Sequence, residues 1–135
     1  MEKAKIKILI IDDEADFCYF IKQNLEATGG FNVDTCSDST QGLEIARQLR
    51  PDLILLDIMM PIKDGFTVLR ELKADELTWA IPVIMLTAKG DSQSVFEGKQ
   101  YHAMDYIIKP FEIKELSRYI KKSLFREEWE DEKEN

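Results

Sequence analysis

The sequence predicts an α/β domain in which helices cover both faces of a parallel β-sheet. Five short apolar segments alternate with five segments of helical periodicity along the 135 residues, and this alternation is typical of parallel sheets with helical crossovers. Three of the apolar segments are nearly unbroken runs of large side chains, the pattern of strands that are buried on both faces. No internal repeat or low-complexity linker divides the chain. One doubly wound domain is therefore expected.

The first half of the chain contains three of the predicted strands, at 5–11, 31–36 and 52–57. The first is the Ile-rich run KIKILII, the second alternates as FNVDTC, and the third is the apolar run DLILLD. Apolar residues at helical spacing predict a helix at about 14–28, which two glycines end. A second helix is expected from Gly42 until just before a proline.

The second half continues the alternation, with predicted strands at 81–87 and 105–109. A helix is expected at about 65–75, and a weaker one at 91–101. The last helix is amphipathic, and its apolar residues are Ile113, Leu116, Ile120 and Leu124.

Composition and charge exclude several classes of protein. The chain is 44% hydrophobic and 33% charged, which is ordinary for a globular domain. No apolar run approaches the ~20 residues of a membrane span, and the start MEKAKIKILII lacks the cleavage site of a signal peptide. We therefore expect a cytoplasmic protein that does not insert into membranes. The two cysteines, Cys18 and Cys36, offer no metal-binding spacing and are expected to be buried free thiols.

The net charge of −8 is concentrated at the C-terminus. Residues 127–135, EEWEDEKEN, contain six acidic residues and one lysine. A charge run of this kind is usually a solvated segment, so we expect a domain over residues 1–126 and an acidic tail at 127–135. Neither part has the basic surface that direct nucleic-acid binding requires.

Five polar residues follow or end the predicted strands. Asp12 and Asp13 come after the first strand, Asp57 ends the third, Thr87 ends the fourth and Lys109 ends the fifth. A single Asp after a strand is more often a helix cap or a turn residue. Ligands of open α/β sheets, however, bind beyond the carboxyl ends of the strands. The presence of polar residues at all of these ends favours a functional site over caps.

The residue types indicate phosphoryl-transfer chemistry. Three converging carboxylates repel one another and raise their own pKa values, and a Mg²⁺ ion with oxygen ligands relieves that repulsion. The metal and the ammonium of Lys109 can neutralise the oxygens of a transferring phosphoryl group, with Thr87 as a hydroxyl donor. Asp57 can then attack in line and carry the group as an aspartyl phosphate.

Four motifs now support a resemblance to a known family. LIIDDE (9–14), LLDIMMP (55–61) with Asp64-Gly65, LTA (86–88) and YIIKPF (106–111) resemble the receiver domain of two-component response regulators, the CheY-like domains. The resemblance covers residues 5 to about 125. It implies a flavodoxin-like fold with five parallel strands in the order 2-1-3-4-5; a response regulator is itself a standard example of that order.

The resemblance also implies a role for each residue of the metal site. Asp57 is the expected phosphoacceptor and is also expected to bind Mg²⁺. Asp13 is expected to bind Mg²⁺ directly and Asp12 through a water molecule. The backbone carbonyl of Met59 is expected to complete the protein ligands.

The same resemblance assigns a phosphoryl site and a switch. Thr87 is expected to donate a hydrogen bond to a phosphoryl oxygen, and Lys109 to form an ion pair with it. Tyr106 occupies the position of the aromatic residue that turns inward when Thr87 moves. We also expect a cis Lys109–Pro110 peptide bond, because the chain must leave the last strand, aim Lys109 at the site and start a helix within about three residues.

The expected function is that of a signalling switch with no enzymatic activity beyond its own phosphorylation and dephosphorylation. A histidine kinase or histidine phosphotransfer protein would phosphorylate Asp57, and the surface formed by segments 91–101, 105–109 and the last helix would bind a downstream protein target. The chain could equally be a receiver domain excised from a larger regulator or a hybrid kinase. Two other classes lack a required residue: a haloacid dehalogenase-like enzyme needs a second Asp at position 59, and a flavodoxin needs a phosphate-binding loop where DDEADF stands.

Overall fold

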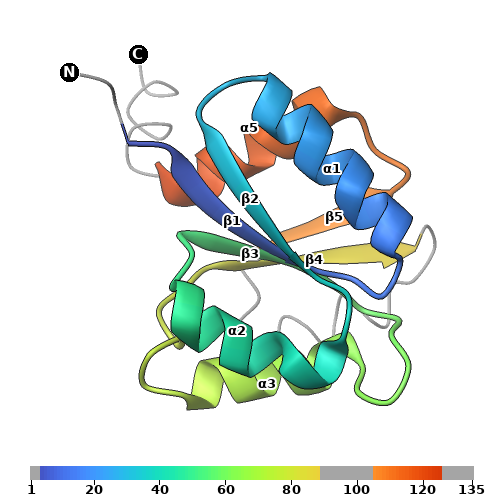
Figure 1. The fold of residues 1–135 in the computed structure, drawn as a ribbon, viewed down its shortest axis with the longest axis vertical. Coiled ribbons are helices and arrows are strands. Elements are labelled where there is room, and N and C mark those ends of the chain that lie inside the picture. Colours follow the sequence, from blue (N-terminus) through green and yellow to red (C-terminus); the bar gives the residue numbers. More distant parts are fainter. Residues whose placement is uncertain (1–3, 89–104, 126–135) are drawn as a thin grey trace.

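The computed structural model describes residues 4–88 and 105–125, and there it contains a five-stranded parallel sheet between two layers of helices (Figure 1). The strand order is β2-β1-β3-β4-β5, so the predicted flavodoxin-like fold and its order are confirmed. The strands are β1 (Ile6–Ile11), β2 (Phe31–Cys36), β3 (Leu53–Asp57), β4 (Val83–Ala88) and β5 (Asp105–Lys109). The helices are α1 (Ala15–Ala27), the 3₁₀ turn η1 (Ser39–Gln41), α2 (Gly42–Leu49), α3 (Gly65–Ala74) and α5 (Ile113–Leu124).

The bounds of the predicted elements differ from the structure by at most two residues wherever the structure describes them. The fourth strand begins at Val83 and not at residue 81, because Pro82 has no N–H to donate to a neighbouring strand. The turn η1 was not predicted; the side chain of Asp38 caps it by accepting the Thr40 N–H. The predicted helix at 91–101 and the tail at 127–135 lie outside the described residues.

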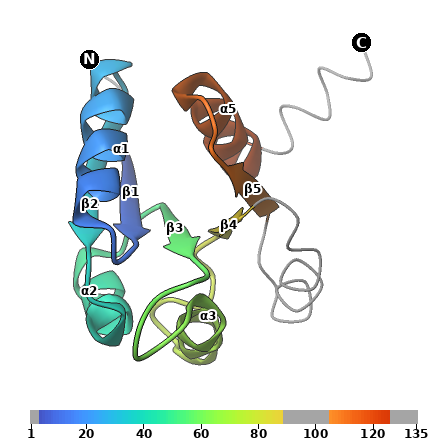
Figure 2. The same cartoon turned by 90° about the vertical axis from the view of Figure 1, so that its right-hand side faces the viewer.

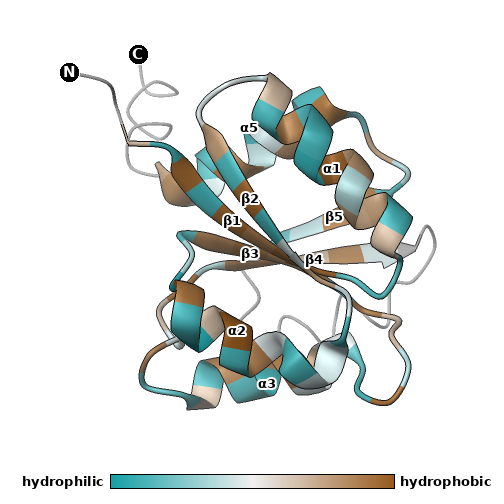
Figure 3. Ribbon diagram, in the orientation of Figure 1, coloured by the Kyte–Doolittle hydropathy of each residue, from teal (hydrophilic) through white to brown (hydrophobic). Residues whose placement is uncertain are grey.

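Each face of the sheet has its own hydrophobic core. Helices α1 and α5 cover one face and α2 and α3 cover the other (Figure 2). Most of the ribbon of the central strands β1 and β3 is hydrophobic (Figure 3), and every residue of β3 is buried. The close packing makes the centre of the sheet rigid, and the ends of β1 and β3 belong to this rigid part. No helix in the described part of the chain is long and apolar enough to cross a membrane.

Parallel pairing brings the polar strand ends together. Ile11 is the register partner of Leu56, so Asp12 and Asp57 are the next residues on two adjacent strands. At the other side of β3, Ala88 is the partner of Lys109, which places the end of β5 beside the end of β4. The sheet therefore delivers the predicted site residues to one edge.

Gly65 fixes the connection that follows Asp57. Its N–H donates to the Ile58 carbonyl at 2.8 Å, so the start of α3 lies directly against the end of β3. A Cβ atom at this position would clash with the backbone carbonyl of Asp57. The side chain of Asp64 caps the helix by accepting the Thr67 N–H at 2.8 Å.

We predict that Gly65→Ala lowers the free energy of unfolding by about 3 kcal/mol, because backbone atoms must shift to admit the methyl group. Gly42→Ala is the matched control at another helix start: its Cβ would meet the side chains of Ile11 and Val68 at 3.2 and 3.3 Å, which can adjust. We expect that control to cost no more than about 1 kcal/mol. Urea unfolding of both variants gives the comparison, and equal losses would contradict the backbone contact.

Candidate functional site

Three carboxylates converge at the carboxyl edge of the sheet. One oxygen each from Asp12, Asp13 and Asp57 lies within 4.8 Å of the others. Asp12 is fully buried and Asp57 is only 7% exposed, whereas Asp13 faces solvent. Two buried carboxylates and one exposed carboxylate thus form a group of oxygen ligands that is accessible to solvent at Asp13. This is the arrangement that the sequence analysis predicts.

Lys109 bridges the two buried carboxylates. Its Nζ atom donates to Asp12 Oδ2 at 2.9 Å and to Asp57 Oδ1 at 3.3 Å. The ammonium also lies 4.3 Å from the centre of the Phe17 ring, and Phe17 packs edge-to-face on Phe111. The side chain is therefore held between acids and an aromatic face. Sequence analysis missed this role of Phe17, because an aromatic residue early in an amphipathic helix reads only as core packing.

The chain turns sharply after Lys109, and the Lys109–Pro110 peptide bond is cis, as predicted.

Burial and mutual repulsion shift the protonation of Asp57. Burial, followed by the charge of Asp12, raises the pKa of Asp57 to about 6, even though Lys109 opposes the shift. For Lys109 itself, burial lowers the pKa, but the hydrogen bonds and charges of Asp12 and Asp57 together outweigh it and raise the pKa above its usual value. The ammonium stays charged while Asp57 is poorly compensated. A further positive charge at this site would stabilise the ionised Asp57.

Asp12 is also held by the start of α1. The Glu14 N–H donates to Asp12 Oδ1 at 3.0 Å, and the Cys18 thiol donates to the Asp12 carbonyl at 3.2 Å. Burial, and then the charge of Asp12, raises the pKa of Cys18 to about 12, so the thiol is neutral and can donate. Cys18 and Cys36 are both free and buried, which confirms the prediction.

Thr87 and Tyr106 lie on the neighbouring strands β4 and β5. Thr87 is buried near the end of β4, and Tyr106 is the register partner of Met85 on β5. The Tyr106 hydroxyl is buried and has no hydrogen-bond partner among the described residues. Burial, and then the charge of Asp105, raises the pKa of Tyr106 to about 12. The structure thus places a neutral phenol on the strand next to Thr87.

The loop after Asp57 has a constrained backbone and two exposed apolar side chains. Met59 and Ile62 are 73% and 92% exposed. Ile62 has a φ of 70°, which a β-branched residue rarely adopts. The residues on either side of it are joined by a hydrogen bond, in which the Lys63 N–H donates to the Pro61 carbonyl at 2.7 Å. Ser39 Oγ donates to the Pro61 carbonyl at 3.1 Å and anchors the turn to η1. Met59 is therefore held in a fixed loop two residues after Asp57.

Comparison with known proteins identifies the family. The family profile described as "Response regulator receiver domain" matches residues 8–121. This chain belongs to the response regulator receiver domain family. Its members are signalling proteins, so the predicted family is confirmed.

Two relatives are DNA-binding regulators by name. The DNA-binding dual master transcriptional regulator RpaA of Synechocystis sp. is 43% identical over 120 residues, which are 89% of this chain and 49% of RpaA. The DNA-binding response regulator MtrA of Mycobacterium tuberculosis is 40% identical over 126 residues, which are 93% of this chain and 54% of MtrA. This chain thus spans about half the length of these curated relatives.

Solved receiver structures have the same fold. The chemotaxis protein CheY4 of Vibrio cholerae superposes with a TM-score of 0.83 at 27% identity, over 90% of this chain and 100% of CheY4. A response regulator receiver domain protein from Clostridium thermocellum superposes with a TM-score of 0.82 at 35% identity, over 92% of this chain and 98% of that one.

The raised pKa of Asp57 predicts how Asp57→Asn affects stability in the presence of a metal chelator. A carboxyl group whose pKa is higher in the folded state binds more protons there, so its contribution to stability falls as pH rises from about 4 to about 6. Replacing it with Asn removes that penalty. We expect the variant to be more stable than the parent by about 1–3 kcal/mol at about pH 7.5, and by progressively less as pH falls towards 4.

Urea unfolding at several pH values measures this difference. Asp34→Asn, which removes an exposed carboxylate on β2, controls for the loss of one negative charge. A destabilised Asp57→Asn variant at about pH 7.5 would contradict the raised pKa.

Proposed function

We propose that this receiver domain is a phosphorylation-dependent switch in which Asp57 accepts a phosphoryl group from a histidine kinase or a histidine phosphotransfer protein. The observation that carries this proposal is the convergence of Asp12, Asp13 and Asp57, two of which, Asp12 and Asp57, pair with the ammonium of Lys109. Asp57 is at the tip of a fully buried strand, so its carboxylate is held rigidly at the rim. Rigid placement of the nucleophile is what in-line transfer requires.

The transfer has a simple balance of bonds. A carboxylate oxygen of Asp57 forms a bond to phosphorus while the bond between phosphorus and the donor's histidine nitrogen breaks. Lys109 keeps its proton and pairs with the phosphoryl oxygens, and the hydroxyl of Thr87 donates a hydrogen bond to one of them. The domain acts as the acceptor and performs no chemistry on other substrates.

The residues at the site fit a Mg²⁺ ion. Their three carboxylates present oxygen atoms within 4.8 Å of one another, and Mg²⁺ prefers oxygen ligands while keeping several of its waters. Asp13 and Asp57 would bind the ion directly, Asp12 through a water molecule, and Met59 through its backbone carbonyl. When bound, the ion neutralises charge on the transferring phosphoryl group.

Phosphorylation is proposed to shift the domain between two states. Thr87 moves towards the phosphoryl group, and Tyr106, on the neighbouring strand, turns inward when Thr87 has moved. The phosphoryl group can favour only a state with which it interacts better. The state is read by a downstream protein target at a surface that includes β5 and α5; the segment at 91–101, which the sequence analysis adds to this surface, lies outside the described residues.

The chain matches only about half of RpaA and of MtrA, and this supports the alternative that it is one domain of a larger regulator or hybrid kinase. We propose that residues 1–126 form the receiver, that residues 127–135 form an acidic tail, and that the domain works in the cytoplasm. Any contact with DNA would belong to another domain, because this chain has a net charge of −8.

Phosphorylation at Asp57 gives a direct test. Incubated with Mg²⁺ and acetyl phosphate, the intact protein should gain the mass of one phosphate, and base should remove it. Asp57→Asn should abolish the gain, whereas the exposed control Asp34→Asn should keep it. Equal labelling of Asp57→Asn and the parent, measured by intact-protein mass spectrometry, would refute the assignment.

The metal roles predict an order of effects. Asp13 faces solvent, whereas an oxygen of Asp12 is engaged by Lys109. We expect Asp13→Ala to weaken Mg²⁺ binding by about 100-fold and Asp12→Ala by about tenfold. Titration calorimetry measures both, with Asp16→Ala, an exposed acid on α1, as the control. The reverse order would mean that the two aspartates exchange roles.

A further inference from the structure

The outer edge of β2 carries backbone groups that could pair with another strand. β2 is at the end of the strand order, beyond β1. On its inner side, the carbonyls of Gly30 and Cys36 accept hydrogen bonds from Ile6 and Asp12. Alternate residues of a strand face the same side, so Phe31, Val33 and Thr35 direct their N–H and C=O groups outward. Such an edge is a template for a further strand.

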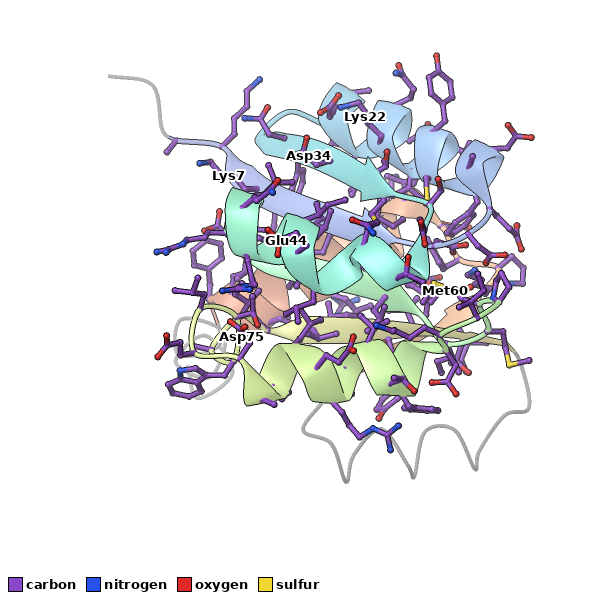
Figure 4. All side chains as sticks on the ribbon, turned by 60° about the horizontal axis from the view of Figure 1, so that its bottom comes forward. Lys7, Lys22, Asp34, Glu44, Met60 and Asp75 are labelled. Atoms are coloured by element: carbon purple, nitrogen blue, oxygen red, sulfur yellow. The ribbon has the colours of Figure 1, made fainter. Side chains whose placement is uncertain are left out.

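Two side chains of α1 occupy the middle of this edge. The Val33 N–H donates to Glu26 Oε2 at 2.9 Å, and Lys22 Nζ donates to the Val33 carbonyl at 2.7 Å. Lys22 and Glu26 also pair with each other at 3.1 Å. Figure 4 shows Lys22 on α1 above β2, with Asp34 on the strand itself. Both outward groups of Val33 are thereby satisfied within the chain.

A surface hollow lies at the same place and runs around the edge from one face of the sheet to the other. Its lining includes Lys22 and Glu26 from α1, Val33 and Asp34 from β2, and Leu49 from α2. The hollow gives an approaching chain access to this edge, but the Lys22–Glu26 pair occupies the pairing groups of Val33.

We propose that the outer edge of β2 is a strand-addition site for β2 of a second copy of this chain, and that Lys22 and Glu26 hold it closed. The two side chains act as an inhibitory contact: they replace the hydrogen bonds that an added strand would make. This inference is independent of phosphorylation at Asp57.

The sequence of β2 favours a second copy as the occupant. Antiparallel pairing about a twofold axis at Val33 sets Val33 opposite Val33, Phe31 opposite Thr35 and Asn32 opposite Asp34. No like charges then face each other, and aromatic and β-branched residues make the cross-strand pairs. The outward-facing residues also fall on the hydrogen-bonded pairs of that register. An interface of this type is isologous and closes as a dimer.

The test uses the double variant Lys22→Ala/Glu26→Ala, which leaves the net charge unchanged. Glu44→Ala/Arg47→Ala is the matched control: it also leaves the net charge unchanged, and it removes the Arg47–Glu44 pair on α2 and the Arg47–Asp75 pair without touching a strand edge (Glu44 is labelled in Figure 4). Sedimentation velocity over a concentration series should show a monomer–dimer equilibrium only in the Lys22/Glu26 variant. A peptide with the sequence of residues 30–37 should bind that variant and not the parent.

Amide hydrogen exchange locates the effect. At low concentration, loss of the Glu26 contact should speed exchange of the Val33 N–H by about tenfold; at high concentration Phe31, Val33 and Thr35 should all become protected. Unchanged protection of β1 and β3 amides shows that the variant is folded. If the double variant does not fold, the single variant Lys22→Met takes its place. It should form the same dimer more weakly, because Glu26 still accepts the Val33 N–H. A folded variant that stays monomeric and does not bind the peptide would overturn the proposal, and so would a parent that already dimerises through β2.

Discussion

Two carboxylates are buried beside one ammonium at the carboxyl edge of the sheet. Asp12 and Asp57 are almost inaccessible to water, and Lys109 alone among the described side chains pairs with both. Ionised acids in such surroundings are costly unless they are compensated. The raised pKa of Asp57 shows that the compensation is incomplete. A site in this state favours binding of added positive charge, and the covalent attachment of a phosphoryl group changes its balance of charges.

The fold supplies the rigidity that keeps these charges together. Parallel pairing sets the ends of β1 and β3 side by side, and the two hydrophobic cores hold the sheet from both faces. Gly65 and the turn at Ile62 hold the following loop against the end of β3. Relaxation that would separate the carboxylates is therefore opposed by packing. Signalling proteins place strain and charge at such rims because small changes there can bias a two-state element.

Most of the fold could be predicted from the sequence, because a buried strand appears there as a continuous run of apolar residues. The runs LILLD and VIMLT read as buried strands directly, and Asp12, Asp57 and Lys109 could be placed together once the strands were assumed to be parallel. Strand order could not be obtained from periodicity and came from the family resemblance. Contacts between side chains distant in sequence could not be predicted either: Phe17 under Lys109 and Cys18 on the Asp12 carbonyl depend on how α1 docks. The clamp of Lys22 and Glu26 on Val33 was hidden for the same reason, since i,i+4 charges on a helix read as a surface ion pair.

We propose that a cation and a phosphoryl group complete the site formed by the carboxylates around Asp57. A crystal structure of the protein with Mg²⁺ and beryllofluoride, a phosphoryl mimic, tests it most directly. We expect beryllium bound to an oxygen of Asp57, and Mg²⁺ at about 2.0–2.1 Å from oxygens of Asp13 and Asp57. Lys109 should have left Asp57 Oδ1 to contact a fluorine atom. A structure in which Lys109 still bridges Asp12 and Asp57, with the metal bound elsewhere, would contradict this account.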